Sequence, residues 1–269
     1  GGFESSSTQP VRMWNSNHPD YQEGKSYTVA KFIPGFQGEQ VMLEGAEKTT
    51  LTENVTKAEM DPWVLLSHKR AIQAAKEGIL SDIQLSIADS KKDEGIRPSM
   101  SQRLLDRLPC LLPGGSIITA ANACLMHDGA AFVVLCSEAY RKKHGLTPQA
   151  AFRFGTAIGS DPFMSPKTAV LAIRKLLKQT ALSIDEIHSL EVNEAFAVID
   201  VLLEREFPGI RERLNPLGGA LAYGHPYGAS GAIILLHLLK DLELNQGRFG
   251  ICGVAAAGGI GTALLVEKV

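Results

Sequence analysis

The feature that most constrains the fold is the alternation of strand-like and helix-like segments after residue 115. Short apolar runs typical of strands occur at 116–123, 129–137 and 152–158. Between and after them, 165–180 repeats apolar residues at helical spacing, and 229–242 is apolar on most sides, which predicts a buried helix. Two further strands are expected at the end of the chain. Strands that alternate with helices predict a layered α/β fold.

Composition excludes several classes of protein. The 269 residues carry 27 basic and 29 acidic side chains, which gives no electrostatic case for a nucleic-acid partner. No apolar run reaches the roughly 20 residues that span a bilayer, so no membrane partner is expected. The four cysteines are scattered and form no CxxC pair, which favours a reducing, cytoplasmic location.

The first half of the chain is less regular. We expect loops over 1–50 and two helices within 51–80, with Thr52 or Asn54 capping the first and Asp61-Pro62 beginning the second.

Asn193 lies in "VNEAFA" (192–197), where a short strand is predicted to lead into a helix from about Glu194. An amide at such a junction can hold a water or an oxyanion in a cleft. The alternative interpretation is an N-cap asparagine with no chemical role.

His225 lies in "NPLGGALAYGHPYGASGA" (215–232), between Gly224 and Pro226. The helix that follows would offer free N–H groups and the positive end of its dipole, which suit a developing negative charge. The alternative is a loop histidine without a catalytic role.

The third stretch is "GICGVAAAGGIGTALLVE" (250–267), in which alanines and glycines join two apolar runs. Small residues there allow a ligand or another backbone to come close. The alternative is a tight structural corner.

Together, these three stretches resemble the C-terminal signatures of the thiolase family in order and spacing. Upstream, "GGFESSS", "LTENV" and "TAANACLMHDGAA" resemble further thiolase motifs, so the resemblance covers nearly the whole chain. It implies an α/β/α/β/α layered fold with an incomplete N-terminal half and an inserted loop domain. Residues 1–10 and 116–145 would belong to the N-terminal half, 11–115 to the loop domain on the CoA side, and 146–269 to the C-terminal half.

The resemblance also implies an activity, acyl-CoA C-acyltransfer by reversible Claisen condensation and thiolysis of short-chain 3-ketoacyl-CoA such as acetoacetyl-CoA. His225 would activate a nucleophilic cysteine, and Asn193 would position a catalytic water. Phe196 would line the pantetheine path, and Gly258 and Gly259 would shape the acyl pocket. Coenzyme A or acyl-CoA is then the substrate, with no covalently bound cofactor and no metal, and a homodimer or homotetramer is expected.

The sequence departs from the family at three places. The nucleophilic cysteine would precede the turn at which this chain begins, Ala255 replaces the acid/base cysteine, and Cys124 replaces a serine that bonds the pantetheine arm. Cys252 is three residues, or about 10 Å along a strand, from Ala255 and would face the opposite side, in the core.

These departures predict a chain that is inactive alone. The alternatives are a non-catalytic acyl-CoA-binding partner subunit and an enzyme that transfers acyl groups without condensation.

Overall fold

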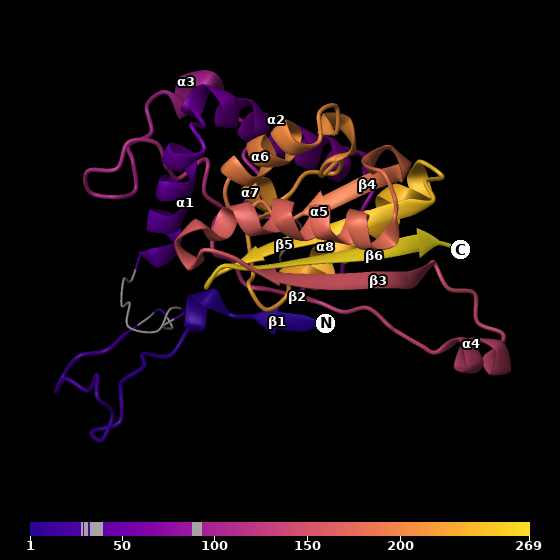
Figure 1. The fold of residues 1–269 in the computed structure, drawn as a ribbon, viewed down its shortest axis with the longest axis horizontal. Coiled ribbons are helices and arrows are strands. Elements are labelled where there is room, and N and C mark those ends of the chain that lie inside the picture. The colour runs from indigo at the N-terminus through magenta and orange to yellow at the C-terminus, as the bar shows by residue number, and fades with distance from the viewer. Residues whose placement is uncertain (28, 30–31, 33–39, 88–92) are drawn as a thin grey trace.

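The computed structural model describes residues 1–27, 29, 32, 40–87 and 93–269 (Figure 1). Its centre is a four-stranded sheet in the order β3-β6-β5-β4. The bounds of these strands are β3 Ala150–Gly159, β4 Ile187–Val192, β5 Phe249–Ala256 and β6 Ile260–Lys268. β4 runs parallel to β5, whereas β6 is antiparallel to both β5 and β3. The strand predicted at 152–158 and the two closing strands are therefore confirmed.

One helix covers each face of this sheet. α5 (Thr168–Thr180) packs against β3, β5 and β6, and α8 (Ser230–Leu244) packs against β4 and β5 (Figure 1). Ile251 of β5 joins the apolar cluster on the α5 side, and its neighbour Cys252 joins the cluster with Leu238 of α8. Side chains of adjacent strand residues point to opposite faces, so each face has its own core.

A second, two-stranded sheet adds another layer. β1 (Gly2–Glu4) pairs antiparallel with β2 (Gly129–Ala131), and α8 also contacts β2. The described residues thus stack as α5, the main sheet, α8 and the small sheet. This alternation of helical and sheet layers agrees with the predicted fold class.

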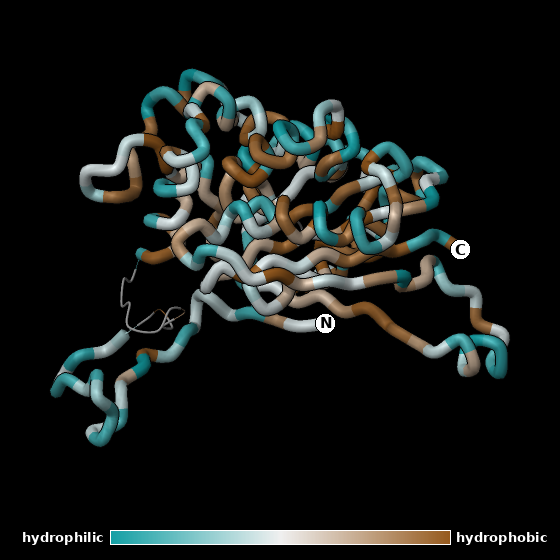
Figure 2. The backbone as a smooth tube through the Cα atoms, viewed as in Figure 1, coloured by the Kyte–Doolittle hydropathy of each residue, from teal (hydrophilic) through white to brown (hydrophobic). Residues whose placement is uncertain are grey.

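The remaining helices lie around this stack. They are α1 Val41–Thr52, α2 Lys57–Glu77, α3 Gln102–Leu105, α4 Glu138–His144, α6 Val198–Glu206 and α7 Ala220–Tyr223. Among the described residues, the short 3-10 helices are η1 Ser6–Thr8, η2 Pro162–Lys167, η3 Ile184–Glu186 and η4 Arg211–Arg213. α2 packs against α6 and α7. In Figure 2, α4 and the loop over 9–27 are mostly hydrophilic, as expected of segments that extend from the main body.

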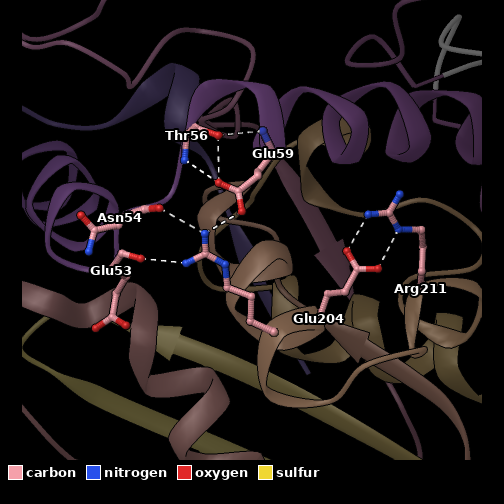
Figure 3. A network of polar contacts seen from close by, with 7 residues as sticks. Glu53, Asn54, Thr56, Glu59, Glu204 and Arg211 are labelled. Carbon is pink, nitrogen blue, oxygen red and sulfur yellow. Dashed lines mark hydrogen bonds and ion pairs between the residues drawn. The ribbon is translucent and has the colours of Figure 1, made fainter.

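The start of α2 differs from the prediction. The helix begins at Lys57, five residues before Pro62, because Thr56 and Glu59 form a capping box (Figure 3). The Thr56 N–H donates to the Glu59 carboxylate at 2.9 Å, and the Glu59 N–H donates to Thr56 Oγ1 at 3.3 Å. This reciprocal pair satisfies N–H groups that the first turn leaves free, and it sets the start of the helix.

The first of the two helices predicted within 51–80 is also wrong, because α1 occupies Val41–Thr52 and so begins in the segment predicted as loops. Thr52 is the last residue of α1, and Asn54 has a φ of 51° in the link to α2. Arg205 of α6 fixes this link, because its guanidinium donates to the carbonyls of Glu53 and Asn54 and to the Glu59 carboxylate.

The strand predicted at 116–123 is absent from the described structure. The Asn122 side chain closes a turn there, accepting from the Thr119 N–H at 2.8 Å and donating to the Ile117 carbonyl at 2.9 Å. Asparagine side chains compete with strand pairing in this way. The strand predicted at 129–137 is shorter than expected and ends at Ala131.

Candidate active site

Asn193 follows the last residue of β4, at the carboxyl end of the parallel strand pair. Its N–H donates to the Gly253 carbonyl at 3.0 Å, so sheet pairing holds its backbone. The side chain is 1% exposed. Buried side chains at the carboxyl ends of parallel strands lie where α/β folds commonly bind ligands.

The helix predicted from about Glu194 begins at Val198 instead, with Ala197 as its N-cap. The backbone between β4 and α6 pairs with the segment around Cys124 instead of forming a helical turn. The Ala195 carbonyl accepts from the Cys124 N–H, and the Ala197 N–H donates to the Asn122 carbonyl. Asn193 is therefore not the N-cap of α6, and its chemical role stays a prediction.

His225 lies in the loop between α7 and α8, and its backbone is fixed by the preceding glycine and by a hydrogen bond of its own N–H. Gly224 before it has a φ of +89°, and a Cβ at that position would lie 2.5 Å from the His127 ring. The His225 N–H donates to the Leu125 carbonyl at 2.7 Å. Glycine is required at 224 because both the left-handed backbone and the close ring exclude a side chain.

The His225 imidazole bridges two side chains. Its Nε2 is 3.2 Å from Asn193 Nδ2, and its Nδ1 is 2.5 Å from Ser230 Oγ. The Ser230 hydroxyl donates its one hydrogen to the Pro226 carbonyl at 2.9 Å, so it accepts from Nδ1–H. Nε2 then carries the lone pair and accepts from the Asn193 amide.

Burial lowers the pKa of His225 to about 4, against a smaller opposing effect of the Glu4 charge. The ring is therefore neutral at neutral pH, with an unprotonated nitrogen beside an amide donor. This arrangement can accept a proton at Nε2 or, once protonated, donate one. The structure brings His225 and Asn193 together across 32 positions of sequence, and their catalytic roles stay a prediction.

Two supporting residues were missed by the sequence interpretation. Ser230, which orients His225, could have been found as a hydroxyl five residues later, at the start of a predicted helix. Glu194 accepts from Ser67 Oγ at 2.7 Å, from the Leu221 N–H at 3.2 Å and from Asn215 Nδ2 at 3.0 Å. It thereby connects the end of β4 to α2 and to α7, which precedes His225. A carboxylate within the apolar "NEAFA" run was the available signal.

Cys124 and Phe196 lie on adjacent segments. The Cys124 N–H donates to the Ala195 carbonyl at 3.0 Å, and Ala123 pairs with Phe196 in an antiparallel bridge. Burial raises the pKa of Cys124 to about 12, so it remains a thiol. Their contribution to CoA binding stays a prediction.

Ala255 lies on β5 opposite Gly261 of β6 and is buried on the α5 side of the sheet. It is two residues beyond Gly253, whose carbonyl holds Asn193, so it lies at the same end of the sheet. Cys252 is buried on the α8 side, as expected from the odd offset, and burial raises the pKa of its thiol well above the usual range.

Gly258 and Gly259 form the turn between β5 and β6, with φ values of +80° and +76°. The Gly259 N–H donates to Ser165 Oγ at 3.1 Å, and its carbonyl accepts from the Ser160 N–H at 2.8 Å. A Cβ on Gly259 would lie 2.3 Å from the Ser160 carbonyl oxygen. The turn itself thus requires glycine, and the predicted role in an acyl pocket is untested.

Other kinds of site are not evident in the part of the chain that the structure describes. No group of three or more His, Cys, Asp or Glu side chains there could hold a metal ion. Within the same residues, every helix is too short or too polar to cross a bilayer. All four cysteines are free thiols.

Comparisons with known proteins identify the chain's relatives. The family model for the thiolase N-terminal domain matches residues 1–139, and that for the thiolase C-terminal domain matches 146–268. Steroid 3-ketoacyl-CoA thiolase FadA6 of Mycobacterium tuberculosis is 32% identical over 271 residues, which cover 99% of this chain and 62% of that protein.

Solved structures show the same relationship. Bacillus anthracis acetyl-CoA acetyltransferase superposes with a TM-score of 0.89 at 31% identity, covering all of this chain and 71% of that one. Human mitochondrial 3-ketoacyl-CoA thiolase in complex with CoA superposes with a TM-score of 0.85 at 28% identity, covering all of this chain and 70% of that one. The chain thus spans between 62% and 71% of these relatives. With both domain models matched and the fold shared, the chain belongs to the thiolase family.

Proposed function

We propose that this chain provides the acyl-CoA site and part of the proton-transfer machinery of an acyl-CoA C-acyltransferase. The reaction is the reversible Claisen condensation and thiolysis of short-chain 3-ketoacyl-CoA such as acetoacetyl-CoA. The observation that carries the proposal is the neutral His225 ring with Nε2 facing the Asn193 amide.

The geometry supports two successive roles for His225. Its unprotonated Nε2 can take the proton of a cysteine thiol, which produces the nucleophilic thiolate. The resulting imidazolium can donate the same proton to a thioester oxygen. Because Asn193 Nδ2 has a second N–H, it can hold a water or the oxygen itself as negative charge develops there.

The site as described has no second acid/base group. The α-carbon of the second acyl-CoA must lose or gain a proton, and alanine at 255 can do neither. Cys252 does not replace it, since it lies three residues earlier on β5, about 10 Å along the strand, and burial raises the pKa of its thiol well above the usual range. Cys124 is also unsuited as a nucleophile because burial raises the pKa of its thiol to about 12. We therefore propose that the chain does not turn over substrate by itself.

A second candidate function is a non-catalytic acyl-CoA-binding subunit. The observation in its favour is that Ala255 packs in the core while the turn after it has two glycines at positive φ. Such a protein would retain the site without the acid/base group.

The wider setting is proposed on the same basis. From the thiolase pattern we propose three parts, which are 1–10 together with 116–145, then 11–115, and 146–269. Cys124 and Phe196 would lie beside the pantetheine path, and Gly258 and Gly259 would lie beside the acyl group. A homodimer or homotetramer in the cytoplasm is the expected state.

Calorimetric titration with acetyl-CoA, followed by intact-mass measurement and product analysis with acetoacetyl-CoA and CoA, tests these proposals. We expect saturable binding that weakens in His225→Gln and is kept in His144→Gln, an exposed histidine on α4. No covalent adduct and no acetyl-CoA product are expected. An acyl adduct without condensation would support the acyl-transferring alternative, and absence of binding would contradict the proposal.

A further inference from the structure

A small cavity adjoins the Asn193–His225 pair. Its volume is about 20 Å³, which is room for one water molecule. Glu191, Asn193, Ser230 and His237 are among the residues that line it. It therefore touches both side chains that contact the His225 ring, on β4 and at the start of α8.

Two buried oxygens near this cavity have no hydrogen-bond partner among the described residues. They are Oε1 of Glu191 and Oδ1 of Asn193, on side chains that are both 1% exposed. Leaving a buried polar atom without a hydrogen bond is costly, so an atom that has no protein partner is commonly paired with ordered water. A cavity of this size with two orphaned acceptors fits a bound water.

A protonated Glu191 would supply the donor that a water between Glu191 and Asn193 Oδ1 needs. Burial raises the pKa of Glu191 well above its usual range, and the charges of Asp241 and Glu194 act in the same direction. Burial thus favours the neutral carboxyl, which donates an O–H. A water can accept that hydrogen and donate one of its own to Asn193 Oδ1.

The orientation of the Asn193 amide matters because its two ends are chemically opposite. His225 Nε2 carries a lone pair, so it needs Nδ2 of Asn193 and would be repelled by Oδ1. We infer that the cavity binds one ordered water that joins Glu191 to Asn193 Oδ1, and that Glu191 is a positioning residue that keeps the Asn193 amide turned toward His225. The inference deepens the proposed function of this site, and its geometry does not depend on turnover.

Two variants at 191 separate hydrogen bonding from packing. Glu191→Gln keeps a neutral donor of the same shape, whereas Glu191→Met keeps the length and removes both polar atoms. Ile234→Val is the matched control, because Ile234 also lines the cavity and contributes no polar group.

The readouts are a high-resolution crystal structure and nitrogen-15 NMR of the side chains. In crystals of the unaltered chain and of Glu191→Gln, we expect electron density for one water in the cavity, within hydrogen-bond distance of residue 191 and Asn193 Oδ1. In Glu191→Met, we expect the Asn193 side-chain amide hydrogens to exchange about tenfold faster, the effect of losing about 1.4 kcal/mol of hydrogen bonding. The His225 Nε2 resonance should shift in the same variant and stay in place in Glu191→Gln and Ile234→Val.

A dry cavity in the unaltered chain would overturn the inference. So would a Glu191→Met variant with unchanged amide exchange and an unchanged His225 resonance. If Glu191→Met does not fold, the inference is decided by whether the cavity water is present in the unaltered chain and in Glu191→Gln. Acetyl-CoA binding is measured separately, so failure of the proposed function would appear there and leave these readouts as they are.

Discussion

At the residue scale, the surroundings of His225 determine which form of its ring the protein uses. Ser230 accepts the Nδ1 proton, the Asn193 amide faces Nε2, and burial disfavours the charged form. A histidine in solution titrates near pH 6.5, so the folded chain shifts it toward the neutral base.

We predict that the His225 ring titrates near pH 4 in the folded chain and near pH 6.5 in urea, as measured by NMR. Because the pKa is lower in the folded state, the ring's contribution to stability is fully present above about pH 6.5, the unfolded-state pKa. That contribution is lost as the pH falls to about 4. Relative to His225→Gln, the chain should lose up to ~3 kcal/mol of unfolding free energy across this window. A difference that is constant with pH would contradict this account.

Cys124 offers a test of the predicted CoA path. A thiol is a weaker donor than a hydroxyl, so Cys124→Ser should bind acetyl-CoA about threefold to tenfold more tightly, the effect of about one improved hydrogen bond. Cys136→Ser is the control, since Cys136 is exposed and lies outside the motif. Equal affinities of the chain and Cys124→Ser in calorimetry would show that Cys124 does not contact the pantetheine arm.

Site residues could be predicted where a local sequence motif marks them, and not where only a contact in the folded structure does. His225 and Asn193 were found because their local motifs mark them. Ser230 carries a weak local signal, a hydroxyl at the start of a predicted helix, whereas nothing in the immediate neighbours of Glu191 indicates that it lines a cavity with Asn193. The place of Glu191 became visible only when the folded structure brought it to the same cavity as Asn193 and Ser230.

At the scale of elements, local patterns predicted the regular segments and failed where tertiary contacts decide. α5, α8 and the hairpin β5–β6 follow directly from apolar spacing and glycines. The 116–123 segment has the composition of a strand, yet the Glu47 carboxylate of α1 accepts from the Ser116 and Ile118 N–H groups. No local pattern predicts that a distant carboxylate takes these N–H groups.

The β5–β6 turn gives a prediction at this scale. Gly259→Ala should destabilise the chain by more than ~1–2 kcal/mol in urea unfolding, because its φ of +76° and the close Ser160 carbonyl exclude a Cβ. Gly231→Ala is the matched control, since its Cβ would enter open space on helix α8. That change should stabilise by about 0.5–1 kcal/mol. Similar effects of the two substitutions would contradict the assigned turn geometry.

At the scale of the whole molecule, an apolar strip remains exposed beside the small sheet. Phe132, Val134 and Leu135 follow β2 and are 68%, 98% and 81% exposed, and Figure 2 shows the strip as hydrophobic between β2 and α4. Among the described residues, this segment pairs with no strand. Contiguous exposed apolar residues commonly mark surfaces of association.

We predict that the chain self-associates through this strip. Sedimentation velocity should show oligomers at micromolar concentration, and the double variant Val134→Lys with Leu135→Lys should weaken association about tenfold or more. Lys143→Glu on α4 changes charge without altering the strip and serves as the control. A monomeric unaltered chain, or unchanged association of the double variant, would contradict the prediction.

The central claim is that the site at the sheet end retains His225 and Asn193 but lacks an acid/base group at 255. It is tested most directly by deuterium incorporation into the acetyl group of acetyl-CoA in D2O, followed by mass spectrometry. The unaltered chain should exchange no faster than buffer, and Ala255→Cys should exchange at least ~100-fold faster, with the gain lost on adding His225→Gln. Rapid exchange by the unaltered chain, or no gain in an Ala255→Cys variant that still binds acetyl-CoA, would contradict the claim.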